Sequence, residues 1–165
     1  MSAKEDEISN HNAPAQNQYL LFLAASELYA IEALKAQEIV EYTSVTKVPM
    51  MNSYVKGVTN IRGNIVPVID LIDRLGLGGI DIGDKTSIVV VNYKQDDEVI
   101  QIGIMIDEVR EVENIPIENI IKAPEFGFKI DTRYVLNMGK YDKKYITILN
   151  TDTILNIDEL SKLFI

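Results

Sequence analysis

The most informative part of the chain is the stretch GVTNIRGNIVPVIDL, which occupies residues 57–71. Two apolar runs flank Gly63-Asn64, a pair suited to a tight turn because glycine adopts positive φ without strain. The stretch therefore predicts a β-hairpin of residues 58–62 and 65–71. Both faces of this hairpin carry apolar side chains, so it must be covered on both sides and lie centrally in the fold. Pro67 has no N–H to donate, which places it at an unpaired or bulged position.

Outward from this hairpin, short apolar runs separated by turn residues indicate a mainly β chain. Ile, Val and Thr number 24, 14 and 8 of the 165 residues, and their branched side chains favour strands over helices. Four further strand pairs and one single strand are expected, at residues 19–24 with 28–31, 37–42 followed by 54–61, 87–93 with 99–106, 107–115, and 133–141 with 145–149.

Helices are expected to be few and short. Asn156 followed by Glu159 is typical of a capping box, and the apolar residues within 160–164 complete the pattern. A short C-terminal helix is therefore predicted. Single helical turns are expected within residues 31–37 and 117–121.

The chain divides into a tail and one domain. Residues 1–17 have no aromatic side chain and scattered charge, so they predict a flexible polar tail ahead of a domain at 18–165. Glycines between residues 76 and 83 mark a flexible connection inside that domain. The short strands and this joint favour two small closed barrels, the second lobe at approximately 85–144, because closure leaves no long strand edge to aggregate.

Composition excludes most enzyme chemistry. The chain has no Cys, which rules out disulfides, Cys-bound zinc, iron–sulfur clusters and thiol catalysis. The single histidine, His11, lies in the polar tail, so a Ser-His-Asp relay or a multi-histidine metal site is not expected. A formal net charge of −9 disfavours binding to nucleic-acid phosphates or anionic membranes. The longest apolar run, residues 19–25, is far shorter than the roughly 20 residues that span a bilayer.

Three motifs resemble known sites without meeting their requirements. Residues 76–79, GLGG, lack the third glycine of a dinucleotide-binding loop, because Asp81 occupies its position. Asp70 and Asp73 are interpreted as a solvated turn or a helix cap. The acidic residues 96–98 do not follow the twelve-residue calcium-loop pattern and are interpreted as a hairpin tip. No metal and no cofactor is therefore expected.

Two other functions remain alternatives. A hydrolase acting through two carboxylates needs a pair of acids about 5–9.5 Å apart in a sugar-sized cleft, one of them with a raised pKa. The chain has 25 Asp and Glu residues, but none stands in an aromatic-rich setting. A small nucleic-acid-binding barrel is disfavoured by the net negative charge.

Arg62 stands beside the expected turn in an otherwise apolar strand. Its planar guanidinium needs a carboxylate or carbonyl partner. The residue is interpreted either as an arginine satisfied by a neighbouring acid or as part of a docking surface, and the two interpretations are compatible.

Residues 57–71 closely resemble the GVxNLRGxVxPVxDL signature of the CheW-like chemotaxis coupling proteins. The resemblance runs in order and at the family's separations from about Gln18 to Asn150. It includes YAI at 29–31, KAQEI at 35–39, TKVP at 46–49, GIMIDEV at 103–109 and IKAPEF at 121–126. The chain departs from the family at Ile61, where Leu is usual, and at Met50-Met51, where a further Pro is common.

This resemblance implies a fold and a task. The fold is mainly β, with two interlocked five-stranded SH3-like barrels and a short C-terminal helix. The task is that of a non-catalytic adaptor in the cytoplasm, recruited to membrane receptor arrays. There it couples the cytoplasmic hairpin tip of methyl-accepting chemoreceptors to the regulatory domain of the histidine kinase CheA. No cofactor, no nucleic-acid partner and no membrane insertion is implied, and the chain is expected to be a monomer in isolation.

In the family, receptors dock in an apolar groove between the lobes. Matched by position, the resemblance assigns this role to Leu34, Ala36, Glu38, Ile39, Gly57, Arg62, Met105 and Val109. The chemistry agrees in part, because Ala36 and Gly57 are small enough for a partner helix to approach and Met105 is adaptable. Met105 and Gly57 also have purely structural interpretations, as a core residue and a turn residue. The opposite charges of Glu38 and Arg62 predict that these two side chains pair.

The domain also occurs in the family fused to a receiver domain, or as the regulatory end of the kinase itself. Because the chain finishes at Ile165, soon after the expected C-terminal helix, a free-standing coupling protein is expected rather than a module of a larger signalling protein.

Overall fold

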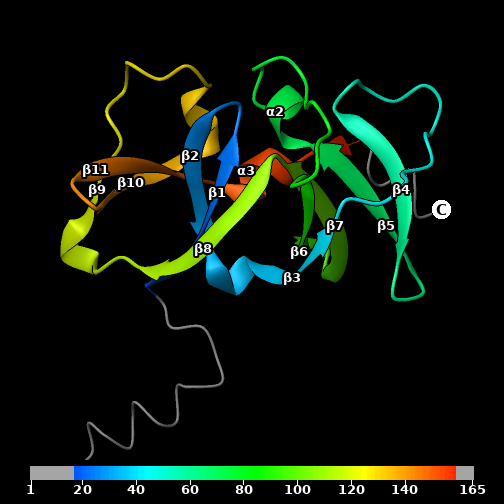
Figure 1. The fold of residues 1–165 in the computed structure, drawn as a ribbon, viewed down its shortest axis with the longest axis horizontal. Helices are drawn as coiled ribbons and strands as arrows, with labels where there is room; N and C mark the ends of the chain where they lie inside the picture. Colours follow the sequence, from blue (N-terminus) through cyan, green and yellow to red (C-terminus); the bar gives the residue numbers. More distant parts are fainter. Residues whose placement is uncertain (1–16, 159–165) are drawn as a thin grey trace, which may run out of the picture.

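The computed structural model describes residues 17–158, which form two β-sheets with a few short helices (Figure 1). One sheet has six strands in the order β8-β1-β2-β11-β10-β9, and the other has five strands in the order β3-β6-β7-β5-β4. We call the parts of the chain built on them the six-stranded lobe and the five-stranded lobe. The mainly β, two-lobed fold predicted from the sequence is confirmed.

The six-stranded lobe combines strands from both ends of the domain, which interlocks it with the other lobe. Its strands are β1 (Gln18–Ala24), β2 (Glu27–Glu32), β8 (Glu108–Asn114), β9 (Ile120–Ile121), β10 (Val135–Tyr141) and β11 (Lys144–Leu149). The five-stranded lobe consists of β3 (Ala36–Glu41), β4 (Val55–Ile61), β5 (Asn64–Asp70), β6 (Ser87–Gln95) and β7 (Glu98–Ile106). The helical segments are η1 (Ala33–Lys35), α2 (Leu71–Arg74), η2 (Ile117–Asn119), η3 (Thr132–Tyr134) and α3 (Thr151–Leu155).

The predicted second lobe at approximately 85–144 does not follow the sheets. β6 pairs with β3 and β7 pairs with β5, so residues 87–106 belong with residues 36–70. The parallel pairing of β5 with β7 joins segments that the chain separates by α2 and a long loop, and local sequence patterns do not encode such a contact. The chain instead passes between lobes after η1 and after β7.

The two lobes repeat one topology. In the six-stranded lobe, β2 of the β1–β2 hairpin pairs in parallel with β11. In the five-stranded lobe, β7 of the β6–β7 hairpin pairs in parallel with β5. Each of these parallel partners leads into a short helix, α3 after β11 and α2 after β5. The helix N-caps also correspond: Asn150 N donates to Tyr134 O and Asp70 N donates to Tyr54 O, both at 2.8 Å. The lobes are therefore equivalent in structure although the sequence shows no repeat.

Each lobe is closed by the chain segment that follows its edge strand. After β3, Thr46 N donates to Val58 O at 2.8 Å and Val58 N donates to Thr46 O at 2.9 Å, so the chain bridges to β4. After β8, the two-residue strand β9 pairs with β10, with Ile121 opposite Met138. The expectation of two five-stranded barrels thus differs from the structure only by the short closing strand β9.

The central hairpin forms where predicted, but its turn is shifted by one residue. Ile61 pairs with Asn64, which leaves Arg62 and Gly63 as the turn residues, with φ of 53° and 86°. Asn60 Oδ1 accepts a hydrogen bond from Gly63 N at 2.9 Å, which stabilises this left-handed turn. Arg62 therefore lies at the tip of the hairpin and not in the strand.

Pro67 occupies an unpaired position, as predicted. It lies opposite Val58, whose backbone N–H and C=O bond to Thr46 instead. The parallel ladder with β7 begins only at Val68, so no partner requires an N–H from Pro67.

Apolar side chains on both faces of the central strands are explained by three clusters. Val66 of β5 belongs to a cluster inside the five-stranded lobe, and Leu21 of β1 belongs to a cluster inside the six-stranded lobe. The other faces of the same strands contribute Ile69 and Phe22 to a third cluster, which contains residues of both lobes. This shared core joins the lobes through apolar burial, the dominant favourable term in folding.

The helical segments agree with prediction in part. The single turns expected at 31–37 and 117–121 are η1 and η2. α3 begins earlier than the predicted C-terminal helix, with Asn150 as its N-cap, and Asn156 is its C-cap instead. Residues 159–165 of the predicted helix lie outside the described residues, as do residues 1–16 of the predicted tail. Asn17, assigned to that tail, accepts a hydrogen bond through its carbonyl from Ile115 N at 2.8 Å.

The glycine-containing segment at 76–83 joins two strands of the same lobe and is held by hydrogen bonds. Leu77 N donates to Ile72 O at 2.9 Å, and Ile80 N donates to Asp70 Oδ2 at 2.9 Å. Leu77 and Ile80 also pack against the shared core. Asp70 is fully buried and caps α2, so the cap interpretation of this residue is confirmed and the solvated turn is wrong.

Candidate docking groove

Hollows lined by residues of both edge strands, β3 and β8, form a groove between the two lobes, and these strands lie near each other in Figure 1. Two hollows lie along it, of about 240 Å³ and about 410 Å³. The smaller, which we call the apolar hollow, is lined by Gln18, Leu20, Ala33, Ala36, Gln37, Glu38, Ile39 and Val112. The larger, which we call the charged hollow, is lined by Glu41, Asp84, Lys85, Thr86, Ser87, Glu108 and Val109.

The apolar hollow presents large hydrophobic side chains to solvent. Ile39 of β3 is 45% exposed and Val112 of β8 is 52% exposed, and they line the hollow from opposite lobes. Leu34 of η1, which precedes β3, is 50% exposed. Exposed apolar groups gathered around a hollow are typical of a surface that binds a partner.

The charged hollow contains an ion network between the lobes. Lys85 Nζ lies 2.9 Å from Glu108 Oε1, and Arg110 Nε lies 2.6 Å from Glu108 Oε2. The hydrogen bond from Lys85, with the charge of Arg110 beside it, lowers the pKa of Glu108 below its ordinary value. The carboxylate therefore stays ionised near neutrality, and the groove is apolar at one end and charged at the other.

Half of the eight predicted docking residues line this groove. Ala36, Glu38 and Ile39 line the apolar hollow, and Val109 lines the charged hollow. Val109 is half-buried and packs against the shared core, so only part of its side chain is available.

Glu38 and Arg62 pair, as their charges predict. Arg62 Nε donates to Glu38 Oε2 at 2.7 Å, with the arginine side chain 79% exposed and the glutamate side chain 23% exposed. The pair lies at the border of the apolar hollow, because Glu38 lines it. The guanidinium keeps free donors that face solvent.

Gly57 and Met105 do not line the groove between the lobes. Met105 is 1% exposed and belongs to the cluster inside the five-stranded lobe. Gly57 is buried with φ of +140°, and a Cβ there would lie 1.9 Å from Thr46 O. The glycine thus allows the chain's own closing segment to approach β4. The expectation that Gly57 admits a partner helix is not what the geometry shows.

Leu20 and Val112 are among the groove residues that sequence reasoning missed. In the sequence, Leu20 is an ordinary apolar strand residue, and in the structure it belongs to the shared core. The available signal for Val112 was an apolar residue among the charged residues of the strand EVREVEN, and the structure shows that this valine is 52% exposed.

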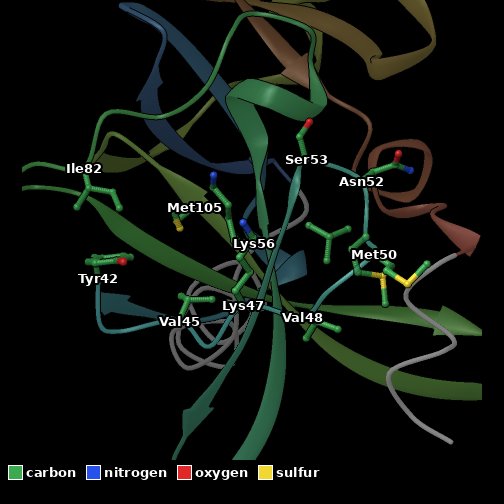
Figure 2. Close-up of a pocket in the computed structure, with 12 residues that line it drawn as sticks. Tyr42, Val45, Lys47, Val48, Met50, Asn52, Ser53, Lys56, Ile82 and Met105 are labelled. Carbon is green, nitrogen blue, oxygen red and sulfur yellow. The ribbon is translucent and has the colours of Figure 1, made fainter.

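A larger hollow, of about 670 Å³, lies on the five-stranded lobe beside the segment that closes it (Figure 2). We call it the lysine hollow. Figure 2 shows Tyr42 and Ile82 on one side, Met50 on the other, and Lys47 and Lys56 between them. Its lining is completed by Val45, Val48, Met51, Asn52, Ser53, Val55 and Met105, and no acid lines it.

One carboxylate pair shares a partner. The Tyr141 hydroxyl lies 2.9 Å from Glu111 Oε1 and 3.2 Å from Glu113 Oε1. These two hydrogen bonds, the Glu111 bond foremost, raise the pKa of Tyr141 to about 12. Neither acid lines any hollow described above, so the pair does not resemble the enclosed acids of a hydrolase.

Among residues 17–158, no cluster of three or more His, Asp or Glu side chains is placed to hold a metal ion. Over the same residues, no helix combines the length and the hydropathy needed to cross a membrane.

Comparison with known proteins identifies the family. A family model described as the CheW-like domain matches residues 18–159. The chain belongs to the CheW-like family. The resemblance recognised in the signature at residues 57–71 is confirmed.

Individual relatives support the same assignment along the whole CheW-like domain. The chemotaxis protein CheW of Klebsiella aerogenes is 33% identical over 144 residues, which are 87% of this chain and 84% of that protein. The chemotaxis protein CheW of Bacillus subtilis is 30% identical over 138 residues, 83% of this chain and 85% of that protein. The crystal structure of the scaffolding protein TtCheW from Thermoanaerobacter tengcongensis superposes with a TM-score of 0.77 at 30% identity, covering 90% of this chain and 93% of that one.

Proposed function

We propose that this chain is a chemotaxis coupling scaffold that links the cytoplasmic hairpin tip of chemoreceptors to the regulatory domain of the histidine kinase CheA. The observation that carries the proposal is the exposed apolar hollow between the lobes, lined by residues at the positions to which the family resemblance assigns receptor docking. The relatives named as chemotaxis proteins and a scaffolding protein support the same role.

The receptor tip binds in the groove. A helix is about 10–12 Å across with its side chains, so one helix of a hairpin can lie along an open groove between two strands and place apolar residues in the apolar hollow. Ile39 and Val112 meet those residues from the two lobes. The Glu38–Arg62 pair at the border supplies donors and acceptors for polar groups at the edge of the contact.

The kinase binds at the lysine hollow, which gives the adaptor its second surface. Lys47 and Lys56 line this hollow without any acid, in a chain whose formal net charge is −9. Met50 is 100% exposed beside them, and methionine adapts to irregular apolar surfaces. The hollow therefore suits a segment of the kinase that combines acidic and apolar side chains.

The setting of the protein follows from this role. It works in the cytoplasm, as a monomer in isolation, and joins receptor arrays at the membrane without entering the bilayer. Each contact can be modest, because membership of an array raises the effective concentration of every partner and multiplies weak affinities. The proposed role includes no catalysis and no cofactor.

A binding experiment tests the groove assignment. Val112→Glu places a charge in the apolar hollow, whereas Val99→Glu changes an equally exposed valine of β7 that lines none of the hollows described. Receptor-containing membrane discs are sedimented with each variant. We expect Val112→Glu to lower receptor binding on the order of tenfold or more, because an unpaired charge opposes an apolar contact. Equal binding of the two variants would contradict the assignment.

A further inference from the structure

Arg74, the last residue of α2, makes contacts that reach across to the other lobe. Its Nε donates to Ile154 O at 2.8 Å and its NH2 group lies 3.5 Å from Thr153 O, both at the end of α3. The last carbonyls of a helix have no partner within the helix, so they accept such bonds readily. Arg74 thus ties the helix of the five-stranded lobe to the helix of the six-stranded lobe.

Two tyrosines hold the guanidinium from both lobes. The Arg74 Cζ atom lies 4.9 Å from the ring centre of Tyr54 and 5.2 Å from that of Tyr134. Tyr54 precedes β4 in the five-stranded lobe, and Tyr134 belongs to η3 in the six-stranded lobe. Both distances are within the range of cation–π attraction, which is stronger where the cation is shielded from water.

These contacts lie where the equivalent parts of the lobes meet. Tyr54 and Tyr134 are structural counterparts, because each carbonyl accepts a hydrogen bond from the N-cap residue of its lobe's short helix, Asp70 or Asn150. Arg74 is the fourth residue after its N-cap and Ile154 is the fourth after Asn150. Arg74 therefore donates to the carbonyl of its own counterpart, between two counterpart rings.

The Arg74 arrangement is more directional than the apolar part of the lobe contact. Apolar burial in the shared core holds the lobes together but is non-directional. A guanidinium presents its donors in a rigid planar fork, so bonds to two carbonyls and faces on two rings fix its orientation relative to both lobes. None of the ion pairs found between described residues involves Arg74, so no carboxylate competes for it.

We propose that Arg74 is a positioning residue that sets the angle between the two lobes and, with it, the width of the docking groove. The groove has one wall on β3 and the other on β8, so any rotation of one lobe against the other moves Ile39 relative to Val112. Arg74 touches neither wall. The effect of this angle on receptor coupling rests on the proposed function, whereas the effect on lobe geometry does not.

A distance measurement tests the geometry directly. The chain has no cysteine, so Asn64→Cys and Lys140→Cys introduce one spin label in each lobe, at exposed positions outside the groove. Pulsed electron paramagnetic resonance then gives the distance distribution between the labels. With Arg74→Gln added, we expect the distribution to broaden or its maximum to move by more than about 2 Å, the scale of a real rearrangement. An unchanged distribution in folded Arg74→Gln would overturn the proposal.

Two further variants separate positioning from general stability. Arg133→Gln removes the other arginine that stacks on Tyr134. The side chain of Arg133 also bonds to Asp131, which belongs to the same lobe. We therefore expect this variant to leave the distance distribution unchanged. Arg74→Lys keeps the charge between the rings but loses the planar fork, so we expect a distribution between those of wild type and Arg74→Gln. Circular dichroism verifies folding of each variant. Broadening by Arg133→Gln equal to that of Arg74→Gln would assign the effect to loss of packing and sink the proposal.

A coupling assay distinguishes failure of this inference from failure of the proposed function. Unlabelled wild type and Arg74→Gln are compared for their ability to bring the kinase to receptor membranes. If wild type couples and Arg74→Gln couples less, the link between lobe angle and groove is supported. If both couple equally although the lobe distances differ, that link is overturned. If wild type does not couple, the proposed function fails and the distance result still decides the role of Arg74.

Discussion

Arg62 Nε donates to Glu38 Oε2 at 2.7 Å, and this bond joins the two opposite edges of the five-stranded sheet. Glu38 belongs to β3, the first strand in the sheet order, and Arg62 to the turn after β4, the last. The pair thus acts beside the Thr46–Val58 bridge in closing the lobe, and it borders the apolar hollow at the same time. Its exposure limits its contribution to stability to about 1 kcal/mol or less, and the role proposed for it is in docking.

Exchange of the two charges tests the proposed docking role of this pair. Glu38→Arg and Arg62→Glu each place like charges side by side, and we expect each to weaken receptor coupling on the order of tenfold. The double exchange restores the pair with its direction reversed and is expected to recover most of the coupling. Receptor-dependent kinase recruitment is the measurement. The same exchange at Glu27 and Lys129, an exposed pair of the six-stranded lobe outside the groove, serves as the control. Failure of the double exchange to rescue would count against a role for the pair.

Gly57 is predicted to be irreplaceable for closing the five-stranded lobe. In Gly57→Ala the new methyl group would overlap Thr46 O, 1.9 Å away, at a φ of +140° that L-residues rarely adopt. We expect a loss of about 3 kcal/mol in the free energy of unfolding, measured by chemical denaturation. Gly83→Ala is the control, because a methyl group there meets nothing within 4 Å. Equal stability of the two variants would show that the bridge tolerates displacement.

The two helix N-caps should differ in their contribution to stability. Asp70 is fully buried and accepts from Ile72 N at 3.0 Å, Asp73 N at 3.2 Å and Ile80 N at 2.9 Å. The side chain of its counterpart Asn150 accepts from Thr153 N, at 3.2 Å. We expect Asp70→Ala to lower the free energy of unfolding by about 2–4 kcal/mol and Asn150→Ala by about 1 kcal/mol. Denaturation curves of the two variants give the comparison, and a larger loss at Asn150 would contradict it.

Alkaline pH is expected to destabilise the fold through its tyrosines. Burial raises the pKa of Tyr29 to about 12, and the hydrogen bond to Glu111, together with desolvation and the bond to Glu113, raises the pKa of Tyr141 to about 12, against an ordinary tyrosine value of about 10. A group whose pKa is raised on folding adds stability below its unfolded pKa and loses it as pH rises to the folded value. The free energy of unfolding should therefore fall between about pH 10 and pH 12.

Ultraviolet absorbance of tyrosinate measures this titration, since the chain has 8 Tyr and no Trp. We expect late-titrating tyrosines in the folded protein, and one fewer in Tyr141→Phe. Titration of every tyrosine together near its ordinary value would show that the environments of Tyr29 and Tyr141 are not as described.

Most strands and the central hairpin could be predicted from sequence because their signals are local. Short apolar runs bounded by turn residues define β1, β2, β6 and β7 without reference to the rest of the chain. The pairing of Glu38 with Arg62 followed from opposite charges at family positions. The one-residue shift of the central turn did not, because it depends on the side chain of Asn60 bonding to Gly63 N.

The arrangement of strands into lobes could not be read from local patterns. It depends on the parallel pairs β5–β7 and β2–β11, which join distant segments. The same limit explains why the groove was only partly predicted: Leu20 and Val112 come from the lobe opposite to the family motif at residues 35–39. Met105 and Gly57 were assigned to the groove by position, whereas their burial is visible only once the lobe is closed.

Reconstitution of the signalling complex tests the central claim most directly. Receptor membranes and CheA are incubated with and without the purified chain, and incorporation of phosphate into the kinase is followed. We predict that the chain brings the kinase to the membranes and changes its autophosphorylation only when receptors are present. If the chain alters neither recruitment nor phosphate incorporation, the account of this protein as a coupling scaffold is contradicted.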